Sequence, residues 1–186
     1  MGRAMRCPLA VAVLLAGSLA GCHGAGPYGH APQYAPQGDE DAMVNSAREY
    51  APVMVGRQPD EWRKGTVVLF GVVEKRAAGP GGQALLTLSV RRLEMRNLCT
   101  TATDDDSCRV TVSDKDFGVV HALVSLRGDD DIGPRSVSSR SLLRVVGTIG
   151  QNSSPADGGI VIHTSWYRHW PAFSYVTTAS ASMMRQ

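Results

Sequence analysis

Two apolar segments of this chain carry a glycine at the same central place, and this feature constrains the fold most. They are Leu69-Phe70-Gly71-Val72-Val73 and Val145-Val146-Gly147-Thr148-Ile149. Side chains alternate between the two faces of a strand, so each glycine shares a face with the apolar residues two positions away. A glycine inside a strand marks sharp curvature or a close backbone approach. We therefore predict two strongly curved strands whose buried residues are Leu69, Val73, Val145 and Ile149.

Further segments read as strands, and with these two they predict an all-β domain. Residues 84–95, 117–126 and 160–170 are rich in apolar residues, 109–113 reads as a short strand, and Gly79-Pro80-Gly81-Gly82 forms a hairpin break. Five short strands with glycines in the first and fourth resemble the OB-fold, a small five-stranded barrel. Another small all-β barrel or a sandwich is the alternative.

The N-terminus predicts an export signal. Arg3 and Arg6 precede an apolar stretch, residues 9–20, that is too short to span a bilayer. Leu19-Ala20-Gly21-Cys22 resembles the bacterial lipobox, which implies cleavage before Cys22 and lipidation of its thiol. An ordinary signal peptide that contains a cysteine is the alternative. We expect an outer-membrane anchor with the domain in the periplasm or at the cell surface; the inner membrane is the alternative address.

These features divide the chain into four parts. Residues 1–21 are the lipoprotein signal peptide, and residues 22–44 are a flexible linker rich in proline, glycine and glutamine. Residues 45–171 form the OB-fold-like barrel domain, and residues 172–186 form a loosely held C-terminal tail. Cys99 and Cys108, both in the barrel domain, predict a disulfide because exported chains keep such bonds. Two free thiols, or less readily a metal site, are the alternatives.

The charge balance argues against nucleic acids as partners. The chain has 19 Lys and Arg against 17 Asp and Glu, and loss of Arg3 and Arg6 leaves 19 − 2 = 17 of each. Proteins that bind nucleic acids normally carry a surplus of basic residues. We therefore expect no nucleic acid partner, although a local basic patch is left open by Arg91, Arg92, Arg96 and Arg109.

The sequence holds no pattern that predicts catalysis, a cofactor or a metal. It has no Gly-x-Ser-x-Gly elbow, no phosphate-binding loop and no dinucleotide fingerprint. The acidic runs 104–106 and 129–131 lack the spacing of a calcium loop. The separations of His121, His163 and His169 give no zinc motif. We therefore expect a non-enzymatic protein without a cofactor.

Four features are together similar to the starvation-induced outer-membrane lipoprotein family. They are the lipobox, a short lead-in that contains proline, the strand 65–74, and the sequence Val-Gly-Thr-Ile-Gly at residues 146–150. The resemblance covers residues 50–170 and implies a non-enzymatic envelope protein, an interaction or structural module on the outer membrane. Its partners would be membrane lipid at Cys22 and an envelope protein; the oligomeric state stays open. The alternative function is a binder of oligosaccharide, or less readily oligonucleotide, through the barrel face.

Aromatic residues crowd near the C-terminus and predict a place for contact with a partner protein. The candidates are Trp166, Tyr167, Arg168, Trp170 and Tyr175. Tryptophan, tyrosine and arginine are the residue types that most often carry binding energy at interfaces. Alternation along a strand would send Trp166, Arg168 and Trp170 to one face and Tyr167 to the other. Plugs at the open end of the barrel, or a stacking platform for glycans, are the alternatives.

Lipidation at Cys22 can be tested by a single substitution. Cys22→Ala should abolish partition into membranes and leave an unprocessed precursor, because the thiol that receives the lipid is lost. Membrane fractionation and the mass of the product measure this. Unchanged fractionation and cleavage at the same bond would contradict the prediction.

Overall fold

The computed structural model describes residues 30–31, 36, 39–94, 97–98, 110–151 and 157–180. Cys22, Cys99 and Cys108 lie outside these residues, so lipid attachment and the disulfide stay predictions. Within the described part of the chain, no helix is long and apolar enough to cross a membrane.

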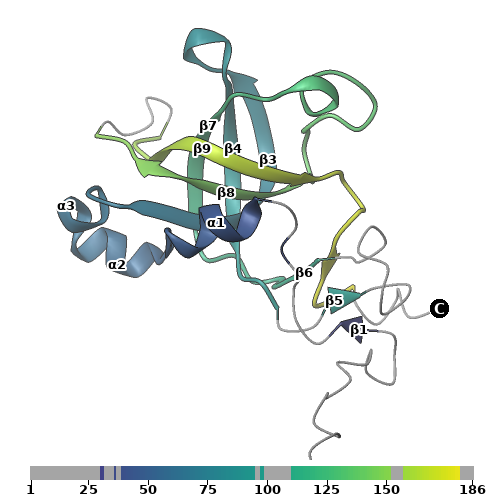
Figure 1. The fold of residues 1–186 in the computed structure, drawn as a ribbon, viewed down its shortest axis with the longest axis horizontal. Coiled ribbons are helices and arrows are strands. Elements are labelled where there is room, and N and C mark those ends of the chain that lie inside the picture. The colour runs from purple at the N-terminus through teal and green to yellow at the C-terminus, as the bar shows by residue number, and fades with distance from the viewer. Residues whose placement is uncertain are drawn as a thin grey trace, which may run out of the picture.

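Five long strands close into a barrel (Figure 1). They are β3 (Thr66–Ala78), β4 (Ala84–Arg91), β7 (Val119–Val124), β8 (Leu142–Ile149) and β9 (Val161–Trp170). Their order is β3-β4-β7-β9-β8, and β8 pairs with β3 to complete the ring. Only β7 and β9 run parallel among these pairs. This closed five-stranded barrel with crossed-over last strands is an OB-fold, and the predicted fold class is confirmed.

Short elements surround the barrel. The lead-in contains α1 (Glu40–Asn45), β2 (Arg48–Glu49), α2 (Pro52–Arg57) and α3 (Pro59–Trp62), and β2 adds to the edge of β3 in parallel. The hairpin break is the 3-10 turn η1 (Pro80–Gly82), and a second turn, η2 (Gly128–Asp130), lies before β8. Two small pairs complete the structure: β1 (His30–Ala31) with β5 (Asn97–Leu98), and β6 (Thr111–Val112) with β10 (Val176–Thr177).

The two central glycines lie where the barrel backbone has no room for a side chain. A Cβ on Gly147 would stand 2.3 Å from the His163 carbonyl oxygen in β9, beside an irregularity in the β8–β9 register. A Cβ on Gly71 would stand 2.8 Å from the Leu88 Cβ. Leu69, Val73, Val145 and Ile149 are all buried in the barrel core. The glycine pattern therefore predicted close approach and the buried face correctly.

A second apolar cluster lies outside the barrel and holds the C-terminal segment. It joins Phe70, Val110, Val112, Leu142 and Trp170, with Val72, Leu93 and Tyr175 packed against them. Val176 is fully buried, and its amide donates a hydrogen bond to the Val110 carbonyl. The expectation of a loosely held tail is wrong for residues 171–180, because strand pairing and burial of Val176 both fix them.

Gly147 should tolerate no side chain at all. We expect Gly147→Ala to lower the free energy of unfolding by about 3 kcal/mol, because the added methyl collides with backbone that cannot turn aside. Gly65→Ala is the matched control, since nothing lies within 4 Å of a Cβ there. Urea denaturation of both variants measures the difference. Equal stability of the two would show that β8 and β9 do not approach as described.

Candidate functional site

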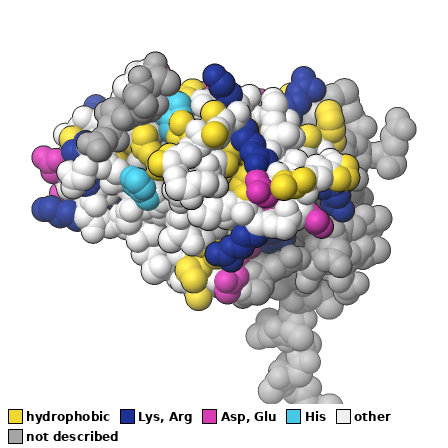
Figure 2. Space-filling view, turned by 90° about the horizontal axis from the view of Figure 1, so that it is seen from above, with side chains coloured by type: hydrophobic (Ala, Val, Ile, Leu, Met, Phe, Trp, Pro, Cys, Tyr) yellow, Lys and Arg dark blue, Asp and Glu magenta, His cyan; other side chains and the backbone are white. Residues whose placement is uncertain are grey.

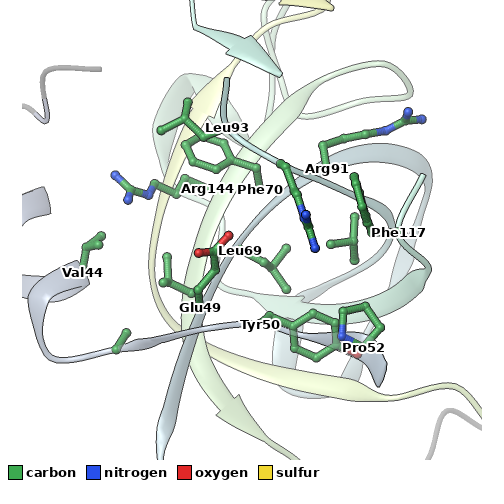
Figure 3. Close-up of a pocket in the computed structure, with 14 residues that line it drawn as sticks. Val44, Glu49, Tyr50, Pro52, Leu69, Phe70, Arg91, Leu93, Phe117 and Arg144 are labelled. Atoms are coloured by element: carbon green, nitrogen blue, oxygen red, sulfur yellow. The ribbon is translucent and has the colours of Figure 1, made fainter. Parts of the chain in front are cut away.

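A pocket of about 380 Å³ lies at the seam between the lead-in segment and the barrel (Figure 3). Its walls come from α1, β2, α2, β3, β4, β8 and the loop that precedes β7. The lining residues are Val44, Ala47, Glu49, Tyr50, Pro52, Val68, Leu69, Phe70, Val90, Arg91, Arg92, Leu93, Phe117 and Arg144. We call it the arginine–aromatic pocket.

Cations lie over an aromatic ring at one wall of this pocket. The Arg92 Cζ is 4.2 Å from the centre of the Phe117 ring, and the Lys115 Nζ is 5.4 Å from the same centre. A positive charge over a ring face is attracted by the ring's quadrupole. Tyr50 also lines the pocket, and burial raises its pKa to about 12, so its phenol stays neutral at physiological pH. The pocket thus combines neutral ring surface with exposed positive charge.

Two carboxylates partly offset the arginines. Glu40, fully buried on α1, binds the Arg144 Nη1 at 2.5 Å through Oε1 and the Arg168 Nη1 at 2.7 Å through Oε2. Glu49 is exposed on β2, and Figure 3 shows its carboxylate directed into the pocket. Arg91 donates a hydrogen bond to the Asp114 carbonyl oxygen. Because the carboxylate of Glu40 balances the charge of Arg144, Arg91 and Arg92 supply the positive charge at the pocket.

The structure brings together only part of the predicted basic patch. Arg91 and Arg92 meet at the pocket, whereas Arg96 and Arg109 lie outside the described residues. Phe117 was missed as a site residue because it begins an apolar stretch that reads as a strand, and Tyr50 was missed because the lead-in around it carries no pattern. Over the wider surface, Figure 2 shows Lys and Arg side chains interspersed with carboxylates and apolar side chains on one face.

The C-terminal aromatic cluster divides between two sides of β9, as alternation predicted. Trp170 is buried, with its ring centre 5.9 Å from that of Phe70, and Arg168 lies over it at 4.6 Å. Trp166 is half-buried, and its Nε1 donates to Asp39. Tyr175 is half-buried in the second apolar cluster. A protein-binding role for the set Trp166, Tyr167, Arg168, Trp170 and Tyr175 stays a prediction.

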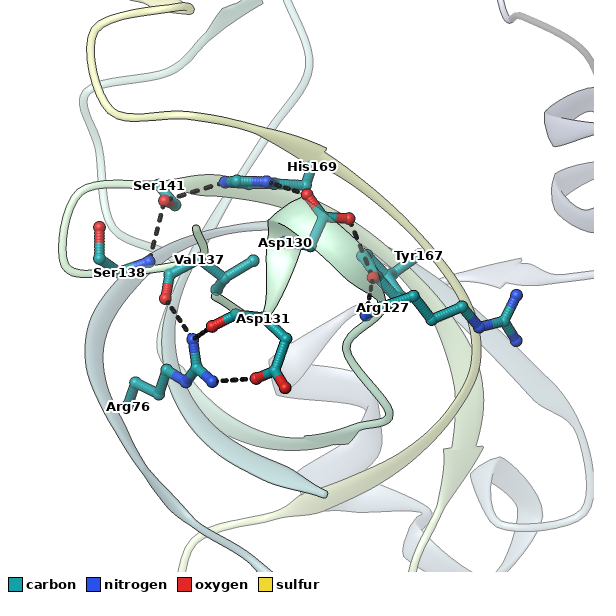
Figure 4. Close-up of polar contacts among 9 residues, drawn as sticks. All are labelled: Arg76, Arg127, Asp130, Asp131, Val137, Ser138, Ser141, Tyr167 and His169. Carbon is teal, nitrogen blue, oxygen red and sulfur yellow. Dashed lines mark hydrogen bonds and ion pairs between the residues drawn. The ribbon is translucent and has the colours of Figure 1, made fainter. Parts of the chain in front are cut away.

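Tyr167 belongs to a polar network at the end of the barrel (Figure 4). Its hydroxyl donates to Asp130 at 2.9 Å, and burial, followed by this hydrogen bond, raises the pKa of Tyr167 to about 12. Asp130 also lies 2.6 Å from His169 Nδ1, and His169 Nε2 lies 3.0 Å from the Ser141 hydroxyl. The sequence did not predict this serine–histidine–aspartate arrangement, because its members lie far apart in the chain. Asp130 and His169 are 39 residues apart, and Ser141 and His169 are 28 residues apart.

This network holds the loop of η2 rather than offering a nucleophile. Ser141 is fully buried, so its hydroxyl is out of reach of a substrate, and it accepts a hydrogen bond from the Ser138 amide. Arg76 ties the same loop to the barrel through Asp131 and the Val137 carbonyl. The acidic run 129–131 therefore contributes two carboxylates to protein contacts.

The three histidines do not meet. His121 binds Asp157 at 2.9 Å, His169 lies in the network above, and His163 is exposed on β9. Across the described ranges, no group of three His, Cys, Asp or Glu residues could hold a metal ion.

The fold is similar to several solved structures. The protein PriB from Ralstonia solanacearum has 15% identity, covers 56% of this chain and 95% of its own, and gives a TM-score of 0.28. A deletion mutant of the single-stranded DNA binding protein from Thermus aquaticus has 17% identity, covers 59% and 52%, and gives a TM-score of 0.30. No family model matches the chain. No match was found among the curated proteins.

These findings correct three expectations. Nothing among them supports the starvation-induced outer-membrane lipoprotein family. The predicted function, an envelope lipoprotein module or an oligosaccharide binder, is not retained: the solved structures found are PriB and a single-stranded DNA binding protein, and their likeness to this chain extends to the fold alone. The exclusion of nucleic acid partners is withdrawn because its basis does not hold: net charge sums over the whole chain, whereas Arg91, Arg92 and Lys115 gather locally.

Glu40 should matter for stability far more than its neighbour. We expect Glu40→Gln to lower the free energy of unfolding by about 3 kcal/mol, because two arginines lose the buried charge that balances them. Asp41→Asn is the matched control, since Asp41 is exposed on the same helix. Thermal and urea denaturation compare the two. A Glu40→Gln protein as stable as the control would contradict this ion-pair assignment.

Proposed function

We propose that this barrel binds single-stranded nucleic acid, with an unpaired base in the arginine–aromatic pocket and the adjoining phosphates on its arginines. One observation carries the proposal: Arg92 and Lys115 both lie over the Phe117 ring at the pocket wall. Proteins that bind single strands without reading sequence combine aromatic surfaces, on which bases stack, with cations that follow the backbone.

The size and chemistry of the pocket agree with this ligand. Its volume of about 380 Å³ lies within the range of about 300–1,000 Å³ usual for small-molecule sites, which leaves room for a base and its sugar. Tyr50, Phe70 and Phe117 line the pocket from the loop after β2, from β3 and from the loop before β7. Arg91 and Arg92 follow one another at the end of β4, where they would meet the charged backbone of a strand.

The binding role that we propose is non-enzymatic. The arrangement nearest to a hydrolytic site, Ser141 with His169 and Asp130, has its hydroxyl fully buried, which supports this part of the proposal. We also keep lipid attachment at Cys22 as a proposal. A barrel held in this way would meet nucleic acid outside the cytoplasm.

Removal of the Arg92 charge tests the proposed function. We expect Arg92→Gln to weaken binding of a fluorescein-labelled oligothymidylate about tenfold, because both a phosphate contact and a stacking cation are lost. Fluorescence anisotropy at low salt measures the affinity. Arg57→Gln is the matched control: Arg57 is an exposed cation on α2 that does not line the pocket.

Removal of a negative charge from the pocket should change the affinity in the opposite direction. Glu49→Gln removes the carboxylate that points into the pocket and should tighten binding a few fold, since repulsion of the phosphates falls. If the unsubstituted chain does not bind the oligonucleotide, or if Arg92→Gln and Arg57→Gln weaken it equally, the proposed function is wrong.

A further inference from the structure

Two residues at the ends of the barrel strands β8 and β9 adopt a backbone conformation that residues other than glycine rarely take. Arg140 and Phe173 both have φ of 70°, and they are the non-glycine residues with positive φ in the described part of the chain. They also contact each other, since the Arg140 Cζ lies 6.0 Å from the centre of the Phe173 ring. Strained backbone of this kind gathers at binding sites, where the surrounding structure over-determines it.

Phe173 is held out in solvent by a fixed segment. Its side chain is 75% exposed, although the flanking residues are tied down. The Ser174 amide donates to the Pro171 carbonyl, and β10 pairs with β6 just beyond. On the other side, the Arg140 amide donates to the Val73 carbonyl of β3. An apolar ring and a cation are therefore displayed together on rigid supports.

Tyr175 connects this pair to the arginine–aromatic pocket. Tyr175 packs against the second apolar cluster, which includes Phe70 of the pocket. Arg91 donates to the Asp114 carbonyl oxygen, and the Asp114 carboxylate accepts a hydrogen bond from Thr178 of the same C-terminal segment. Arg91 lines the pocket, and Arg140 contacts Phe173. Cations and rings thus alternate along one path, which we call the arginine–aromatic ridge: Arg91, Tyr175, Arg140 and Phe173.

We propose that a single strand bound in the pocket continues along this ridge, where Arg140 contacts a phosphate and Phe173 stacks on a second base. This inference rests on the proposed function and adds a second contact point to it. The alternation of cations and rings matches the alternation of phosphates and bases in an unpaired strand.

One carboxylate, that of Asp114, lies beside the ridge and provides a further substitution for testing it. Asp114 lies beside Arg91, and Thr178 donates a hydrogen bond to it. A hydrogen bond with the Thr177 side chain, aided by the charge of Arg91, holds the pKa of Asp114 below its usual range. Asp114 is therefore ionised at physiological pH and repels a phosphate near the start of the ridge.

Strand length separates the ridge from the pocket in an experiment on the purified full chain. Anisotropy is measured with four-nucleotide and twelve-nucleotide oligothymidylates, because the shorter strand fills the pocket alone. We expect Phe173→Ala to weaken the twelve-nucleotide strand about tenfold and to leave the four-nucleotide strand unchanged. For the longer strand, Arg140→Gln should reduce the slope of log affinity against log salt concentration by about 0.7. Asp114→Asn should tighten binding of the longer strand, because a negative charge beside the ridge is removed.

Ile132→Ala is the matched control, because Ile132 is 80% exposed and lies off the ridge. Unchanged melting temperatures verify that the variants fold. If neither strand binds the unsubstituted chain, the proposed function fails and the ridge fails with it. If Arg92→Gln weakens both strands while Phe173→Ala weakens neither, only the ridge is wrong. Equal binding of a polyglutamate peptide would also overturn the ridge, since such a peptide has charge but no bases.

Discussion

The structure depends on one strand, β3, that pairs with β4 along one edge and with β8 along the other. This double pairing closes the sheet, and it requires the backbone to bend more tightly than side chains permit. Gly71 and Gly147 meet that requirement, since a Cβ at either position would collide with a facing strand. Without closure there would be no curved outer wall on which the lead-in and the C-terminal segment could pack.

The candidate site follows from how that wall is covered. Buried Glu40 fixes α1 through Arg144 and Arg168, and the second apolar cluster fixes the C-terminal segment over Phe70 and Trp170. The pocket lies beside β4 where these two additions meet the barrel, and Val44 of α1 lines it together with Phe70 and Leu93 from the second apolar cluster. The packing of the lead-in and of the C-terminal segment against the barrel thus places the aromatic rings that line the pocket. Arg91 and Arg92 lie at its edge because β4 ends at Arg91.

The sequence predicted the barrel because its signals are local. A glycine between apolar residues, alternation along β4 and the break at residues 79–82 each act within a few residues. The site depends on pairs far apart in the chain, and no local pattern indicates them. Glu40 and Arg144 are 104 residues apart, and Asp130 and His169 are 39 apart. Net charge misled for a related reason, since it carries no information about which cations gather.

Binding of a single strand at the arginine–aromatic pocket can be followed residue by residue through the amide chemical shifts of the labelled chain during titration with oligothymidylate. We expect the largest shifts at Arg91, Arg92, Phe117 and the lead-in residues near Tyr50, all of which surround the pocket. Shifts confined to the outer face of β4 and β7, around Thr87 and His121, or no shifts at all, would contradict it.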